Sequence, residues 1–348
     1  MNISACKNFI LSHKTAVIAI LMSLFLGITG VWVVIGLRSD KPKDLIELIK
    51  ETQPYDASEE LKAAVRIAAD NIQNPQTADD YFLKAYAVYV NWQLSEAKEY
   101  FKKVVELDPN NAAAYNYMGN IYTIEKNYAF AIGCLQKAIE IAPDFADAYN
   151  SMGIVCSEKG EYDKAIEWYQ KTIEKDPNHT SVYYNMGNIC YQKNNIDLAI
   201  SYYKKAIETD PDYVKTYFYL GVIYSEREEY DQAIKYYQKV IEIDPNDADT
   251  YYHIGFLYYM KREYDTSIEY FQKAIDINPN ESNTYSTLGM AYCAKGEYDQ
   301  TIKYCQKAIE INPNDGTAYH YLGMAYRENG EFDRAKEYFK KAEDLIPK

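Results

Sequence analysis

The chain has 348 residues, of which 48% are hydrophobic and 38 are tyrosine, enough apolar surface for a continuous core, so general disorder is excluded. The formal net charge of −14 repels phosphate backbones and disfavours nucleic acid as a partner. The six cysteines form no CxxC pair and no zinc-like cluster with the four histidines, so the sequence indicates no metal site. We expect the five cysteines that follow Cys6 to be buried free thiols.

An uncharged apolar run predicts a transmembrane helix near the start of the chain. Residues 15–37 have no charged side chain over 23 positions, and a helix of that length spans about 34 Å, enough to cross a bilayer. A cleaved signal peptide is the alternative, but its apolar region is shorter and ends in a small-x-small site that this run lacks. We therefore expect a tail over residues 1–14, an uncleaved anchor over residues 15–37 and a single-pass membrane location. Basic residues flank both ends of the run, so the side of the membrane is left undetermined.

The following segment, residues 38–77, is interpreted as a linker and a degenerate capping helix. The stretch 59–72 is amphipathic, and its apolar residues at helical spacing share one face: Leu61, Ala64, Val65, Ala68 and Ile72. Asp56 and Glu59 have the spacing of a capping box ahead of this stretch. We expect this helix to cover the first end of the structure that follows.

Three residue types recur through the rest of the chain with a common period of 34 residues. Nine of the eleven prolines fall on this grid, at Pro75, Pro109, Pro143, Pro177, Pro211, Pro245, Pro279, Pro313 and Pro347. Glycines repeat it at Gly119, Gly153, Gly187, Gly221, Gly255, Gly289 and Gly323. Tyrosines repeat it at Tyr81, Tyr115, Tyr149, Tyr183, Tyr217, Tyr251, Tyr285 and Tyr319. Three registers in phase indicate an array of stacked structural repeats.

Each unit of 34 residues predicts two helices. In the unit that begins at Ala112, residues 112–127 carry apolar side chains at spacings of three and four, and residues 128–141 repeat this pattern. Pro143 then ends the unit, because proline cannot continue a helix and disfavours helical geometry in the residue before it. A hairpin of two helices cannot bury its apolar faces alone, so neighbouring units must stack.

The units resemble the tetratricopeptide repeat family. With Ala112 as place 1, they carry an aromatic residue at place 4, glycine at place 8, tyrosine at place 11, alanine at place 20, an aromatic residue at place 24 and proline at place 32. Ala85 replaces the glycine in the first repeat, and Leu135 and Cys305 replace the aromatic residue at place 24. The repeats begin at Ala78, Ala112, Ala146, Thr180, Val214, Ala248, Ser282 and Gly316. The resemblance implies an all-α fold, a right-handed solenoid of about eight helix-turn-helix repeats over residues 78–348, after the transmembrane helix.

The sequence contains no motif for catalysis or for a cofactor. It has no glycine-rich phosphate loop, no HExxH and no nucleophile elbow, and its four histidines are scattered. Carboxylates are abundant but recur beside lysines, as in Lys137 and Glu140, which is typical of a solvated helix face with local ion pairs. We therefore expect a protein that is not an enzyme and that has no catalytic, cofactor or metal site.

The resemblance implies a partner-binding surface on the inner, concave side of the solenoid, formed by places 2, 5, 9, 12 and 13 of each first helix. Asparagines on or beside these places can pair with an extended peptide backbone, namely Asn116, Asn120, Asn150, Asn185 and Asn188. Aromatic residues there can anchor apolar side chains, or else only complete the core between helices, namely Tyr184, Phe218, Tyr252 and Phe256. Two carboxylates at place 13, Glu158 and Glu226, favour a basic segment as the ligand.

Together these features predict a membrane-tethered scaffold that binds an extended peptide or a segment of a partner protein. Two alternatives stay open. One is a self-assembling structural scaffold that forms a homo-oligomer, since Phe339 and Leu345 leave apolar surface at the end of the last repeat. The other is a regulatory subunit of a separate enzyme.

Overall fold

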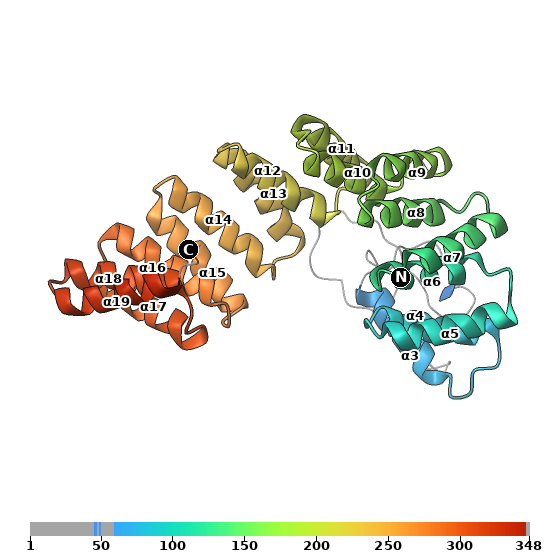
Figure 1. Ribbon diagram of the computed structural model, residues 1–348, viewed down its shortest axis with the longest axis horizontal. Helices are drawn as coiled ribbons and strands as arrows, with labels where there is room; N and C mark the ends of the chain where they lie inside the picture. Colours follow the sequence, from blue (N-terminus) through green and yellow to red (C-terminus); the bar gives the residue numbers. More distant parts are fainter. Residues whose placement is uncertain (1–44, 47–48, 50–58, 346–348) are drawn as a thin grey trace, which may run out of the picture. The chain divides into compact units, whose positions relative to one another are not determined.

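The computed structural model describes residues 45–46, 49 and 59–345 (Figure 1). Regular structure in this part of the chain is entirely helical, with seventeen α-helices and no strand. The chain divides into two compact units, unit 1 up to His179 and unit 2 from Thr180. Each unit is described by itself.

Consecutive helices pack as hairpins in both units (Figure 1). In unit 1, α3 (Glu59–Asn71) packs on α4, and the hairpins are α4 (Ala78–Tyr89) with α5 (Leu94–Leu107), α6 (Ala112–Ile124) with α7 (Tyr128–Ile141), and α8 (Ala146–Glu158) with α9 (Tyr162–Lys175). In unit 2 they are α10 (Thr180–Gln192) with α11 (Ile196–Thr209), α12 (Val214–Glu226) with α13 (Tyr230–Ile243), α14 (Ala248–Met260) with α15 (Tyr264–Ile277), α16 (Ser282–Lys295) with α17 (Tyr298–Ile311), and α18 (Gly316–Glu328) with α19 (Phe332–Leu345). The expected all-helical architecture of packed hairpins is confirmed, while the handedness of the solenoid and the domain limits stay predictions.

The predicted amphipathic stretch forms helix α3, whose apolar face lies against the first hairpin. Leu61, Val65 and Ala69 are buried in one hydrophobic cluster with Phe82 and Leu83 of α4. Exposed residues occupy the other face, including Ile67, which is 47% exposed. The helix therefore buries apolar surface of α4 that no preceding hairpin covers within the described residues, although its role as a cap stays a prediction.

The two helices of a hairpin meet where the side chain at place 24 lies on the backbone of the glycine at place 8. A Cβ atom added to Gly221 would lie 2.6 Å from the ring of Tyr237, and one added to Gly187 would lie 2.6 Å from the ring of Tyr203. Such distances are far below van der Waals contact, so only glycine fits. The same arrangement joins Gly119 to Leu135, which explains why leucine can replace the aromatic residue there.

The ring at place 24 also reaches the next repeat, where it stacks on the residue at place 6. Tyr203 stacks on Tyr219 with ring centroids 6.0 Å apart, and Tyr237 stacks on His253 at 5.4 Å. In unit 1, Phe101 stacks on Tyr117 at 5.2 Å. One aromatic side chain therefore joins its own hairpin to the following one.

Much of the remaining tyrosine forms a second stack within each hairpin. Tyr236 at place 23 stacks on Tyr224 at place 11, with ring centroids 5.3 Å apart and an interplanar angle of 9°. Tyr304 stacks on Tyr292 in the same way, at 5.3 Å and 3°. Offset or parallel ring contacts contribute beyond the area they bury. The high tyrosine content is therefore explained by a repeated packing contact, without any chemistry of the hydroxyl group.

Each first helix ends in a left-handed residue at place 15. Glycine stands there in three repeats, as Gly160, Gly296 and Gly330. The other five repeats have non-glycine residues with positive φ, namely Trp92, Lys126, Asn194, Glu228 and Arg262. In the second repeat the following N–H of Asn127 donates to the carbonyl of Tyr122 at 2.8 Å, the bond that closes a Schellman motif. The turn therefore forms whether or not glycine is present, at a conformational cost where it is absent.

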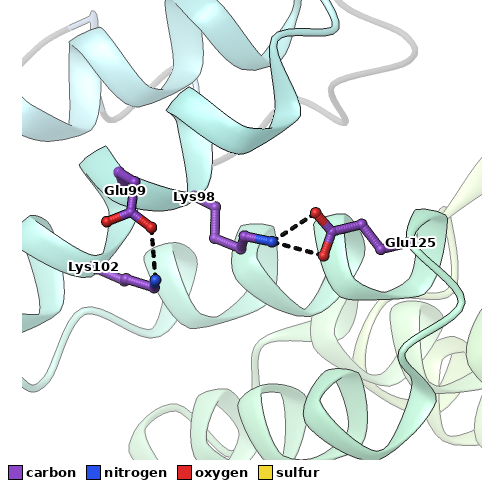
Figure 2. A network of polar contacts seen from close by, with 4 residues as sticks. All are labelled: Lys98, Glu99, Lys102 and Glu125. Atoms are coloured by element: carbon purple, nitrogen blue, oxygen red, sulfur yellow. Dashed lines mark hydrogen bonds and ion pairs between the residues drawn. The ribbon is translucent and has the colours of Figure 1, made fainter.

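Ion pairs connect neighbouring repeats along their surface. In unit 1, Lys98 of α5 contacts both carboxylate oxygens of Glu125, just after α6, at 2.6 and 2.7 Å (Figure 2). In unit 2, three pairs link place 18 of one repeat to place 14 of the next: Asp197 with Arg227 at 2.6 Å, Asp231 with Lys261 at 3.0 Å and Asp265 with Lys295 at 2.7 Å. These pairs lie on the surface, so they contribute register more than stability.

The predicted membrane location is corrected by the structure. Within the described residues no helix combines the length and apolar character needed to cross a bilayer. The hairpin helices have 12 to 14 residues, and 14 residues at about 1.5 Å each extend about 21 Å, short of the roughly 30 Å of a bilayer core. The predicted transmembrane helix, residues 15–37, lies outside the described residues, as do the tail 1–14 and most of the linker.

We predict that Gly221→Ala lowers the free energy of unfolding by about 1 to 3 kcal/mol, because the added methyl group overlaps the Tyr237 ring. The matched control is Gly133→Ala in α7, where nothing lies within 4 Å of the added Cβ. This control should stabilise the chain by about 1 kcal/mol, because alanine favours a helix over glycine. Urea unfolding of both variants followed by circular dichroism measures the difference. Equal effects of the two substitutions would contradict the packing described here.

We predict that Glu228→Gly raises the free energy of unfolding by about 1 kcal/mol, because glycine relieves the left-handed strain at φ 59°. Glu228→Ala serves as the control, since it removes the same charge but keeps a Cβ atom. Thermal unfolding should show a higher Tm for the glycine variant than for the alanine variant. Indistinguishable Tm values would mean that the turn carries no strain.

Candidate functional site

The predicted inner-surface residues of unit 1 are less accessible than their polarity suggests. Asn116 of α6 is 4% exposed and Asn150 of α8 is 1% exposed, whereas Asn120 is half-buried. The Oδ1 atom of Asn116 has no hydrogen-bond partner. Of these three amides, only Asn120 therefore presents a part of its side chain to solvent, and its contact with a partner stays a prediction.

Unit 2 holds Asn188 in the hydrogen-bond network of its own hairpin. The hydroxyl of Tyr203 donates to Asn188 Oδ1 at 2.7 Å. Tyr184 lies on the same amide, although burial outweighs that hydrogen bond and raises the pKa of Tyr184 to about 12. Asn185 at place 6 is half-buried beside them. The amide of Asn188 thus orients two tyrosines, and a backbone ligand would have to compete with Tyr203 for its oxygen.

The predicted aromatic residues of unit 2 join into one continuous row across three first helices. Tyr184 of α10 lies 5.7 Å from Tyr219, Tyr219 lies 6.0 Å from Phe218, and both belong to α12. Phe218 lies 5.4 Å from His253, and His253 lies 5.7 Å from Tyr252 of α14. We call Tyr184, Tyr219, Phe218, His253 and Tyr252 the aromatic row. All five side chains are half-buried, so each completes the core with one part and meets solvent with another.

Two members of the aromatic row, Tyr219 and His253, were not among the sequence predictions. Both stand at place 6, one position after the inner-surface place 5. Burial lowers the pKa of His253, although Asp249 and Asp247 oppose the shift. The imidazole is therefore neutral at neutral pH and acts here as an aromatic spacer. The signal that could have identified these residues is the run of consecutive aromatic side chains at places 4, 5 and 6 of the same helix.

Beside the row lies Phe256, the most exposed of the predicted aromatic residues. Its side chain is 37% exposed and stacks on Tyr259 with ring centroids 6.3 Å apart. Tyr252, one turn earlier, is held by a hydrogen bond from Asn283 of α16 to its hydroxyl at 3.0 Å. Phe256 therefore offers an oriented ring with one face open to solvent.

Both predicted carboxylates are exposed at the ends of first helices. Glu226 accepts a hydrogen bond from Tyr191 at 2.7 Å. Burial, and then this hydrogen bond, raise the pKa of Tyr191 to about 12. The negative charge of Glu226 also reaches Tyr237, which lies 5.6 Å from Phe218. In unit 1, Glu158 contributes in the same way to the raised pKa of Tyr169, after burial as the main cause. Glu226 is thus the carboxylate that the structure brings near the aromatic row.

The cysteines of the described residues are all free thiols, and four of the five are buried while Cys134 is half-buried. Burial raises the pKa of each of them, so they stay protonated and unreactive at neutral pH. Among the described residues, no group of three or more His, Cys, Asp or Glu side chains could hold a metal ion.

Family comparison agrees with the repeat pattern. Models of the tetratricopeptide repeat match residues 93–111, 110–178, 181–213, 214–247, 248–281 and 280–348. The chain belongs to the tetratricopeptide repeat family, and its fold is that of a protein-interaction scaffold, a class that is typically non-catalytic. None of the curated proteins matches the chain.

Solved structures with the same fold include part of a tetratricopeptide repeat protein from Cytophaga hutchinsonii, at 21% identity and a TM-score of 0.54 over 69% of this chain and 99% of that one. A pilF structure from Pseudomonas aeruginosa has 22% identity and a TM-score of 0.51 over 60% and 94% of the two chains. The MamA protein has 34% identity and a TM-score of 0.45 over 48% and 91%. The first two likenesses show the fold.

We predict that the chain loses stability between pH 10 and pH 12. The pKa of Tyr86 is raised to about 12 by burial. Such a tyrosine stabilises the fold fully below its unfolded pKa of about 10, and this contribution falls by about 1.4 kcal/mol per pH unit above it. Urea unfolding at pH 8, 10 and 11 measures the loss. Tyr86→Phe is the control and should flatten the dependence, because its hydroxyl has no partner to lose. A stability independent of pH up to 11 would contradict the burial of these hydroxyl groups.

Proposed function

We propose that this chain is a scaffold that binds a segment of a partner protein on the inner face of unit 2. Phe256 is the single observation that supports this most, because its ring is 37% exposed beside the half-buried aromatic row. An aromatic side chain that is already oriented loses little entropy on binding, and such residues dominate the energy of protein interfaces. The stack on Tyr259 supplies that orientation.

The segment that suits this face is apolar and basic. Glu226 places an exposed carboxylate beside Tyr191 and close enough to Tyr237 to affect its ionisation. A net charge of −14 over the chain adds a long-range attraction for a basic partner. Charges of this kind increase the association rate and fix the orientation of a ligand more than they increase affinity. We therefore propose apolar side chains on the aromatic row, with a lysine or arginine near Glu226.

We also propose that the chain acts without catalysis of its own. The family to which it belongs typically serves as a scaffold, and many of the surface carboxylates pair with lysines three residues away. Examples are Lys205 with Glu208 at 3.0 Å and Lys307 with Glu310 at 2.9 Å. Such pairs hold their charges on solvated helix faces, where no reacting group is oriented.

We predict that Phe256→Ala weakens the capture of peptides by the full chain at least tenfold. The probe is an array of fifteen-residue peptides that vary in apolar and basic content. Phe332→Ala is the matched control, because Phe332 is also exposed in unit 2, at 68%, but lies in the second helix of its hairpin. Capture that falls equally in both variants, or in neither, would contradict the proposed surface.

The electrostatic part of the proposal has its own arm on the same array. Glu226→Lys should shift the preference from basic to acidic peptides, and the shift should fade at high salt. Glu242→Lys is the control, because Glu242 pairs with Lys239 on the second helix α13. An unchanged preference with Glu226→Lys, with helicity intact, would remove the basic partner from the proposal.

A further inference from the structure

The inner-surface places of the first repeat differ from those of the later ones because all of them are buried. Phe82 and Tyr86 of α4 are 0% exposed, and Tyr89 is 5% exposed. At the same places of α14, Tyr252 and Tyr259 are half-buried and Phe256 is exposed. Something therefore covers the inner face of α4 that does not cover the inner face of α14.

The cover is a piece of the same chain that precedes the repeats. Leu45, Ile46 and Ile49 are helical and are 5%, 2% and 0% exposed. Their spacing places them on one face of a helix, and they belong to one hydrophobic cluster with Phe82, Tyr86 and Tyr89. We call these three residues the cover.

Tyr117 of α6 connects the cover to the inner face by a hydrogen bond. Its hydroxyl donates to the carbonyl oxygen of Ile49 at 3.3 Å. The ring of Tyr117 lies 5.8 Å from Phe82, 5.6 Å from Tyr86 and 5.5 Å from Tyr89. The cover therefore occupies the inner face of α4 and α6, the kind of surface on which the family resemblance places a ligand.

The cover leaves two polar atoms of this face unsatisfied. The Tyr86 hydroxyl and Asn116 Oδ1 are buried and have no hydrogen-bond partner. An unpaired buried donor or acceptor carries its full desolvation penalty. One of these groups can donate and the other can accept, which matches the carbonyl and N–H groups of a peptide backbone. A ligand that pairs both would occupy the face better than the cover does.

We propose that the cover is a displaceable intramolecular ligand that closes the inner face of α4 and α6 until a competing segment replaces it. The competing segment carries apolar side chains with the spacing of Leu45, Ile46 and Ile49 and pairs Tyr86 and Asn116. This inference rests on the proposed function for the nature of the competing ligand, but the contact of the cover itself does not depend on it. A closed face binds with an affinity reduced by the fraction of molecules that are open.

The test uses the full chain and a fluorescent synthetic peptide with the sequence of residues 42–53. Leu45→Asp with Ile49→Asp should release the cover, so this variant should bind the peptide at least tenfold more tightly than the natural chain does. Ile67→Asp is the matched control, because Ile67 is 47% exposed on α3, and it should bind as the natural chain does. Equal peptide affinity in the released variant and the natural chain, or no binding to a released variant that keeps its helicity, would overturn the proposal.

A second measurement needs no substitution, and it covers the case in which the released variant fails to fold. Hydrogen exchange of the natural chain should show protected amides around Ile49, and excess peptide should remove this protection. Exchange around Ile49 at the rate of a free peptide would overturn the cover. Failure of peptide capture by unit 2 would instead remove the proposed function and leave this protection unchanged, so the two failures are distinguishable.

Discussion

The hairpins of this chain depend on one contact, in which a side chain from the second helix lies on the backbone of a glycine in the first. A Cβ atom at Gly323 would lie 2.7 Å from the ring of Phe339, and the same holds in the other repeats that have the glycine. Because the ring at place 24 then stacks on place 6 of the next repeat, as Tyr237 does on His253, one side chain fixes both the hairpin and its neighbour. The distance between helices, and hence the surface they present, follows from this contact.

The sequence predicts the fold well because that contact leaves periodic marks. The prolines and glycines recur every 34 residues, and the first and second helices lie where the two apolar patterns within each unit place them. The turn at place 15 was not predicted, because only three of its eight residues are glycine and the others adopt positive φ against their preference. The ion pairs between repeats were not predicted either, because partners such as Asp231 and Lys261 are 30 positions apart and belong to different helices.

The candidate site was predicted less completely, for a physical reason. Place numbers indicate which side of a helix a residue occupies, but exposure depends on the side chains of adjacent helices. Asn150 and Asn116 share an inner-surface place with Phe218, yet the first two are buried and the third is half-buried. The continuity of the aromatic row through Tyr219 and His253 likewise depends on contacts between repeats that no single repeat specifies.

The stacking of each place-24 ring on the following repeat has a consequence for how the fold opens. Within a unit, the contacts between hairpins join sequence neighbours, so the hairpins behave as a line of coupled elements with no long-range closure. Damage to one element then weakens its two neighbours and leaves more distant ones intact, and opening starts at an end, where only one neighbour is present. The terminal hairpin of α18 and α19 has a partner on one side only among the described residues. Its amides should therefore define the lowest rung of a graded ladder of local opening, with the interior hairpins above it.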